Sequence, residues 1–139
     1  DEQRQRCLTI EAAARDQLIA TRVMDPAVDL AARQARSRGV YVVIQTIRVR
    51  EATQSTPMGE VECFRRALVG VLGEARAGAR VRALWRDGDP GLAATIALVG
   101  ELPGQETIDQ LLDDIARCAP LLDFRWSVDE DSLLIEAWH

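Results

Sequence analysis

The chain has 139 residues, a length that fits one compact domain able to bury roughly two thirds of the surface that its unfolded chain would expose. Hydrophobic residues make up 47% and charged residues 28%, which excludes an intrinsically disordered chain. The net charge of −5 is uneven: residues 1–50 hold 9 Arg and 6 acidic residues (+3), whereas residues 101–139 hold 2 Arg and 10 acidic residues (−8). Because most arginines alternate with Asp and Glu, no nucleic-acid partner is expected, and the charge favours a protein partner, a second copy, or simply solvated faces.

The first 58 residues predict a helical region followed by one strand. Residues 3–22 place apolar side chains at three-to-five-residue steps, which indicates a helix with a narrow apolar stripe. Asp25-Pro26 interrupts this helix because a residue before proline disfavours the helical backbone, and a second helical piece is expected from there to Gly39. The run VYVVIQTIRVR, residues 40–50, is rich in β-branched residues and predicts a strand.

From Gly59 onward the same order of elements occurs twice. The first unit has a helix that ends at Gly78, the strand RVRALWR, the turn DGDPG and the apolar strand LAATIALV. The second unit has a helix that ends at Pro120, the strand LDFRWSV, the turn DEDS and the strand LLIEAW. The helix of the first unit has a stripe of small residues, Cys63, Ala67 and Gly70. This stripe is expected to let the protein's own sheet approach the helix closely.

Two helix–strand–strand units can hide their apolar faces by lying side by side. The predicted fold class is α+β: a circularly permuted ferredoxin-like αββ-αββ repeat with a four-stranded antiparallel sheet and its helices on one face. The apolar second strands are expected at the centre and the arginine-bearing first strands at the edges, with Trp85 and Trp126 largely buried. We divide the chain into an N-terminal helical stalk plus extra strand, residues 1–58, and the ferredoxin-like domain, residues 59–139.

No catalytic, cofactor-binding or metal-binding residues are predicted, and we expect no enzyme and no cofactor. The only histidine, His139, is the last residue and offers no positioned general base, and no phosphate-binding or dinucleotide glycine motif occurs. The turn carboxylates are Asp87 and Asp89 in one unit and residues 129–131 in the other. We expect the two turns at opposite ends of the sheet, where they cannot share a metal ion.

Cys7, Cys63 and Cys118 are odd in number and widely spaced, so they indicate neither a disulfide framework nor a zinc site. Free thiols are expected, and a Cys63–Cys118 bridge between two helices stays open for an oxidising compartment. No apolar run approaches the roughly 18 residues that span a bilayer. Because the chain begins at Asp1 without an initiator Met, we expect an upstream segment to have been removed.

Residues 62–138 resemble the periplasmic domain of the M component of type II secretion systems and the related PilO-like proteins of type IV pili. The similar stretches are CFRRALVGVLGEARAGARV, GLAATIALVGEL, IDQLLDDIARCAPLLDF and DSLLIEAW, with the apolar pattern Leu111, Leu112, Ile115, Pro120 and Leu122. The resemblance implies the permuted ferredoxin-like fold and a structural role in the inner-membrane platform of a secretion or pilus system. It also implies a soluble domain in the periplasm, membrane contact only through an upstream inner-membrane anchor, and pairing with itself and with an L-type partner.

We expect a homodimer that forms through an exposed strand edge or the first helix. The candidate interface residues lie on the extra strand and on the arginine-bearing strands: Tyr41, Val43, Ile47, Val49, Arg80, Arg82 and Arg125. The alternative function is a small-ligand-sensing regulatory domain, like ACT-type modules or the soluble tail of MgtC-like membrane proteins, which bind small molecules between paired copies.

Overall fold

The computed structural model describes residues 2–4, 23–49, 57–118 and 121–139. The predicted first helix, apart from residues 3 and 4, and Cys7 lie outside these ranges. The helices and strands follow in the order α2 (Pro26–Ser37), β1 (Tyr41–Arg48), α3 (Met58–Glu74), β2 (Arg80–Asp87), β3 (Leu92–Val99), α4 (Gln105–Ala116), β4 (Asp123–Val128) and β5 (Ser132–Trp138). Within the described ranges, no helix has both the length and the apolar content to cross a membrane.

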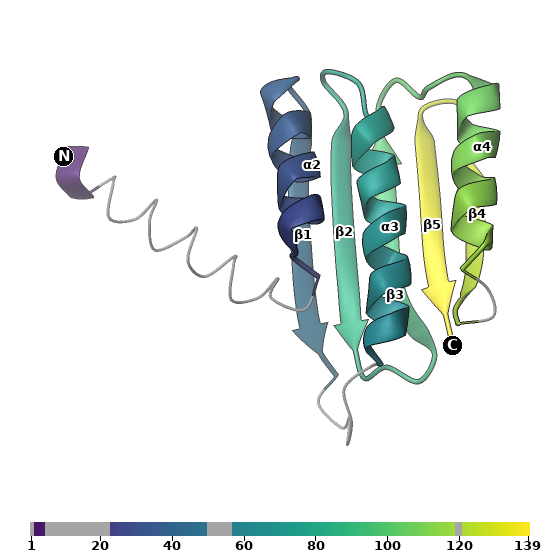
Figure 1. Ribbon diagram of the computed structural model, residues 1–139. Coiled ribbons are helices and arrows are strands. Elements are labelled where there is room, and N and C mark those ends of the chain that lie inside the picture. Colours follow the sequence, from purple (N-terminus) through teal and green to yellow (C-terminus); the bar gives the residue numbers. More distant parts are fainter. Residues whose placement is uncertain (1, 5–22, 50–56, 119–120) are drawn as a thin grey trace.

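The strands form one mixed, five-stranded sheet in the order β1-β2-β3-β5-β4, and the fold class is therefore α+β, as predicted. Figure 1 shows α2, α3 and α4 together on one face of this sheet. Strands β2, β3, β5 and β4 are joined by antiparallel pairings, and the second strand of each αββ unit lies inside, as its apolar sequence indicated.

The sheet differs from the expected four-stranded one because β1 joins it. Strand β1 pairs in parallel with β2, with Tyr41 opposite Arg80 and Arg48 opposite Asp87. The connection between these two strands contains α3, as parallel neighbours require a crossover. The expectation that both arginine-bearing first strands are edges is therefore wrong for β2, whereas β4 is an edge strand.

The side chains of the strands alternate between the face under the helices and the opposite face. In β2, Val81, Ala83 and Trp85 are buried under the helices, and Arg80 and Arg82 point the other way and are exposed. Trp85 is 0% exposed, as predicted, and its ring centroid lies 5.2 Å from that of Phe64 on α3.

The prediction that Trp126 is buried is wrong, because this side chain is 45% exposed. Trp126 lies opposite the buried Ile135 of β5 and therefore points to the helix side of the sheet. Strand β4 is an edge strand with a neighbour on one side only, so the side of the indole away from β5 has no strand beside it.

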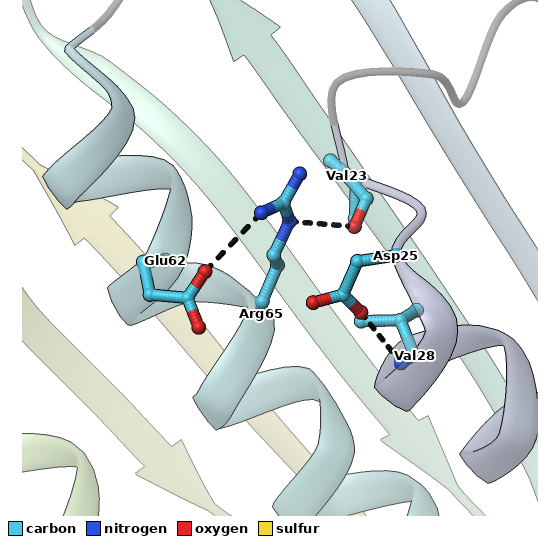
Figure 2. Close-up of polar contacts among 5 residues, drawn as sticks. All are labelled: Val23, Asp25, Val28, Glu62 and Arg65. Carbon is cyan, nitrogen blue, oxygen red and sulfur yellow. Dashed lines mark hydrogen bonds and ion pairs between the residues drawn. The ribbon is translucent and has the colours of Figure 1, made fainter.

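Helix α2 is fastened to α3 at its beginning. Asp25 is its N-cap residue and accepts a hydrogen bond from Val28 N at 2.8 Å, and Pro26 occupies the first turn, where its missing N–H costs nothing. Figure 2 shows Arg65 of α3 beside this turn, donating from Nε to the carbonyl oxygen of Val23 at 3.0 Å and pairing with Glu62 at 3.2 Å. The residues that lead into α2 are thus held against α3.

A second arginine fastens the other end of α2. Arg38, the C-cap residue, donates to the carbonyl oxygens of Leu72 at 2.7 Å and Ala75 at 3.1 Å, groups that the end of α3 leaves without helical partners. Gly39 follows with a φ of +89°, a backbone conformation that glycine adopts without strain, and the chain turns into β1 as predicted.

The stripe of small residues on α3 serves a different neighbour from the one expected. At Gly70 a Cβ atom would lie 2.6 Å from Cδ1 of Leu111, so the missing side chain makes room for α4 and not for the sheet. Helices α3 and α4 are in contact beside one another, and Cys63 lies on the same stripe, facing the end of α4 at Cys118.

Candidate interaction surface

The sheet has one face that α2, α3 and α4 do not cover, and we call it the open face. Its members follow from the strand registers, because residues directly opposite in neighbouring strands project to the same side. Starting from the exposed Arg80 and Arg82, the open face comprises Tyr41, Val43, Gln45, Ile47, Arg80, Arg82, Leu84, Arg86, Thr95, Ala97, Val99, Ser132, Leu134, Glu136, Trp138, Asp123, Arg125 and Ser127.

Six of the seven candidate interface residues predicted from the sequence lie on this face, five of them on β1 and β2. Tyr41 and Val43 lie opposite Arg80 and Arg82 across the β1–β2 pairing, and Ile47 lies farther along β1. Val49 follows the end of β1, and its N–H donates to the carbonyl oxygen of Asp87 at 3.0 Å. The remaining predicted residue is Arg125, which lies on β4 at the opposite edge of the sheet.

The open face is partly apolar and accessible. The exposed fractions are 66% for Tyr41, 49% for Val99, 41% for Ile47 and 38% for Leu134, on β1, β3 and β5. These large apolar side chains lie on three different strands of one surface and are not scattered singly over the molecule. Such a surface is typical of a protein–protein contact.

Charge divides the open face into two halves. The β2 half carries Arg80 and Arg82, for which no ion pair is found among the described residues, and Arg86, which pairs with Asp89 at 2.9 Å. On the other side of β3, Glu136 of β5 likewise has no ion pair within the described part of the chain.

Strand β4 contributes one further charged pair to the second half. Arg125 pairs with Asp123 at 3.1 Å, and its guanidinium lies 5.0 Å from the centre of the Trp138 ring. The acidic turn of residues 129–131 follows at the end of β4. One half of the face is therefore cationic and the other half is anionic on balance.

Sequence reasoning missed Glu136, although a signal for it exists. In LLIEAW this residue alternates with the buried Ile135 and Ala137, which marks it as a side chain of the opposite face. Only the register shows that Glu136 stands opposite Arg125 on one side and Thr95 on the other, one row from Arg82.

Several polar groups cluster at the end of the sheet where β2 ends and β3 begins. His139 Nε2 lies 2.8 Å from Glu60 Oε2, and the N–H of His139 donates to the carbonyl oxygen of Gly91 at 2.9 Å. A hydrogen bond from the backbone N–H of Gly91 and the neighbouring Arg86 lower the pKa of Asp89. These contacts hold the β2–β3 turn, the start of α3 and the end of β5 together.

The two acidic turns lie at opposite ends of the sheet, as predicted. Leu92, at the start of β3, is opposite Trp138 at the end of β5, whereas Val99 is opposite Ser132. Among the described residues, no group of three or more His, Cys, Asp and Glu side chains is arranged to hold a metal ion.

A similar fold occurs in a solved structure of a histidine kinase. No protein-family model and no curated protein sequence matches this chain. The chain aligns with histidine kinase AdeS from Acinetobacter baumannii at 10% identity and a TM-score of 0.51, covering 81% of this chain and 59% of AdeS. The fold is one that a histidine kinase also has. This chain thus spans well under two thirds of the AdeS chain.

Two further structures align less closely. They are the cytoplasmic segment of histidine kinase QseC (11% identity, TM-score 0.49, 81% of this chain and 68% of that chain) and the mycobacterial sensor histidine kinase MprB (15%, 0.45, 81% and 91%). Both TM-scores are lower than that of AdeS, and both identities are too low to show more than a shared arrangement of elements.

These comparisons overturn several expectations from the sequence. The resemblance to the M component and the PilO-like proteins is wrong, and with it the role in a secretion or pilus platform and the pairing with an L-type partner, because the structure that aligns at a TM-score above 0.5 is the histidine kinase AdeS. The same finding contradicts the expectation that the protein is not an enzyme. The apolar pattern that carried the resemblance marks the packing positions of two αββ units, which more than one fold family uses.

Proposed function

We propose that this chain is a regulatory signalling domain that senses a small ligand and works as a symmetric pair of copies joined at the open face. The fold similarity to the histidine kinase AdeS, at a TM-score of 0.51 over 81% of this chain, is the observation that supports a signalling role. The regulatory alternative predicted from the sequence agrees with it better than a secretion platform does. In this proposal the αββ-αββ repeat is a permuted ferredoxin-like unit to which β1 has been added.

Charge complementarity supports pairing with a second copy. Strand β3 is the middle strand, with β2 and β5 on either side of it, so a twofold axis through β3 sets β2 of one copy against β5 of the other. Arg82 shares a row with Ala97 and Leu134, and Glu136 shares the next row with Leu84 and Thr95. A twofold axis that lies in the interface plane, crosses β3 between these two rows and is inclined to the strands brings Arg82 of each copy to Glu136 of the other.

The size of the open face also fits a dimer. Five strands at the usual spacing make a face about 24 Å wide, and strands of this length are about 25 Å long. The flat area of the face is therefore roughly 600 Å², without the area that protruding side chains add. A standard interface buries about 800 Å² per partner, which is of the same order, and the exposed side chains of Tyr41, Val99 and Leu134 add accessible area to the flat estimate.

A charge-reversal experiment tests the pair. Light scattering with size-exclusion chromatography is expected to give a dimer for the wild type and monomers for Arg82→Glu and for Glu136→Arg alone, because a pair of identical variants would set like charges against each other. An equimolar mixture of the two variants is expected to form a dimer again. In the mixed pair, position 82 of each copy meets a residue of opposite charge at position 136 of the other copy.

The matched control is Arg33→Glu, an equal change of charge on α2, on the helix side of the sheet. It is expected to leave the dimer intact. The proposed pair is contradicted by a monomeric wild type at high concentration, by a mixture that stays monomeric, or by a dimer that both single variants retain.

A thermal-shift screen with amino acids and with nucleotides plus Mg²⁺ tests the sensing part of the proposal separately. Nucleotides are included because the similar structures are named kinases. A ligand present at about 100 times its Kd stabilises by about 2.7 kcal/mol, which raises Tm by roughly 8–10 °C in a chain of this size. A saturating rise supports ligand sensing, and the absence of any shift across the screen contradicts it.

A further inference from the structure

The two described cysteines lie together between α3 and the end of α4. Cys63 is in the first half of α3 and is only 6% exposed, and Cys118 follows the last turn of α4 and is partly exposed. The thiol of Cys63 donates to the backbone carbonyl oxygen of Cys118 at 3.9 Å, and the nearby Cys118 side chain contributes to a raised pKa of Cys63. Both thiols are free.

The surrounding packing holds this arrangement in place. The N–H of Cys118 donates to the carbonyl oxygen of Ile115 at 3.1 Å, and the N–H of Leu121 donates to that of Cys118 at the same distance. On the α3 side, the missing side chain of Gly70 allows the two helices to approach closely. Because Cys63 Sγ already lies 3.9 Å from the backbone of Cys118, rotation of the two side chains can bring the sulfur atoms to bonding distance.

We propose that Cys63 and Cys118 are a redox modification site, at which a hydroperoxide converts the two thiols into a reversible disulfide that ties α3 to α4. The site is separate from the open face, because both helices lie on the opposite side of the sheet. The proposal therefore does not depend on the pairing of two copies.

The chemistry proceeds in two steps. Cys118, the more exposed of the two, attacks the hydroperoxide as a thiolate after its proton has passed to water. The O–O bond breaks, the sulfur becomes a sulfenic acid, and the alkoxide or hydroxide that leaves takes up a proton from water. The sulfur of Cys63 then attacks the sulfenic sulfur, the S–S bond forms and water leaves. Two thiols are oxidised by two electrons and one peroxide is reduced.

The different environments of the two thiols support this order of events. Burial, together with the hydrogen bond to Cys118, raises the pKa of Cys63 to about 12, so this thiol stays protonated at neutral pH and is a poor first nucleophile. Of the charged groups near Cys63, Arg66 lowers its pKa and Glu60 raises it, both by less than burial does. Cys63 is therefore placed to resolve a sulfenic acid and not to start the reaction.

Peroxide treatment of the reduced full chain tests the proposal. After stoichiometric hydrogen peroxide and trapping of free thiols with N-ethylmaleimide, mass spectrometry is expected to show a Cys63–Cys118 linked peptide and a mass loss of about 2 Da that dithiothreitol reverses. The bond closes a loop between residues 55 positions apart, so Tm is expected to rise by roughly 5–15 °C on oxidation.

Variants separate this pair from the remaining cysteine. Cys118→Ser and Cys63→Ala are each expected to abolish both the linked peptide and the rise in Tm, whereas Cys7→Ser keeps both. Should Cys63→Ala fold poorly, Cys118→Ser carries the test, because its residue is partly exposed. The proposal is overturned if Cys118 is oxidised to sulfinic acid without a linked peptide, or if the bridge that forms involves Cys7.

Discussion

The same substitution, glycine to alanine, is expected to have opposite effects at two positions of this chain. Gly100 follows β3 with a φ of +135°, a conformation that residues with a Cβ rarely adopt. A Cβ at this position would also lie 2.9 Å from Cα and 3.2 Å from Cβ of Ala79. Ala79 cannot move aside easily, because its carbonyl oxygen accepts the N–H of Tyr41 at 2.9 Å where β1 begins.

The cost of Gly100→Ala follows from these two contributions. Backbone strain of this kind costs about 1–3 kcal/mol, and overpacking against a fixed neighbour costs about 1–3 kcal/mol more. We therefore expect the free energy of unfolding to fall by about 3–5 kcal/mol and Tm by roughly 10–20 °C. Gly73 is the control: it is exposed on α3, nothing lies within 4 Å of a Cβ added there, and alanine favours the helix by about 0.5–1 kcal/mol.

Urea denaturation followed by tryptophan fluorescence and circular dichroism measures both variants on one scale. Gly100→Ala should lower the midpoint without a change in slope, and Gly73→Ala should raise it. A Gly100→Ala variant within about 0.5 kcal/mol of the wild type, or a Gly73→Ala variant that is less stable than the wild type, would refute the reasoning.

Two other predictions concern burial and pH. Trp85→Ala is expected to lower the free energy of unfolding by about 3–5 kcal/mol, because its side chain is fully buried. Trp126→Ala is expected to lower it by only about 1–2 kcal/mol, because that side chain is 45% exposed. Equal losses for the two variants in urea denaturation would contradict the structure. The hydrogen bond from Gly91 N, with Arg86, lowers the pKa of Asp89 from 3.8, so its stabilisation is present above about pH 4 and is lost as pH falls through the lower folded value. Asp89→Asn should therefore weaken the dependence of Tm on pH below about pH 4, and an unchanged dependence would show that other carboxylates cause it.

The two αββ units could be predicted because local sequence determines them. The alternation of Val81, Ala83 and Trp85 with arginines sets the two faces of β2, and the apolar LAATIALV and LLIEAW strands take interior positions with a neighbouring strand on each side. The start of α2 at Asp25-Pro26 could also be predicted from local sequence, because a capping carboxylate and a proline act without a distant partner.

The features that sequence reasoning missed depend on distant pairings. Nothing within residues 40–50 indicates that this strand lies parallel to β2, and its arrival turns a predicted edge into an interior strand. The exposure of Trp126 depends on what covers an edge strand, and the neighbour of Gly70 depends on where α4 lies. None of these follows from periodicity, which reports faces and not neighbours.

The candidate interaction surface was predictable in part for the same reason. Exposed apolar and arginine side chains on β1 and β2 could be chosen from alternation alone, and the structure places them on one face. The acidic counterpart, Glu136, belongs to the other αββ unit, and only the strand order sets it symmetrically across β3 from β2. Self-complementarity of a surface is a property of the assembled sheet.

The parallel pairing of β1 with β2 has a consequence for how the chain folds. Hairpins β2–β3 and β4–β5 join strands that are neighbours in the sequence, whereas β1 meets β2 only after α3 has been placed between them, with Tyr41 opposite Arg80. Contacts across such a separation carry a larger loop-closure cost than hairpin contacts and slow the search for the native state. The strand richest in β-branched residues therefore depends on a non-local pairing for its place in the sheet, as does the pairing of β3 with β5.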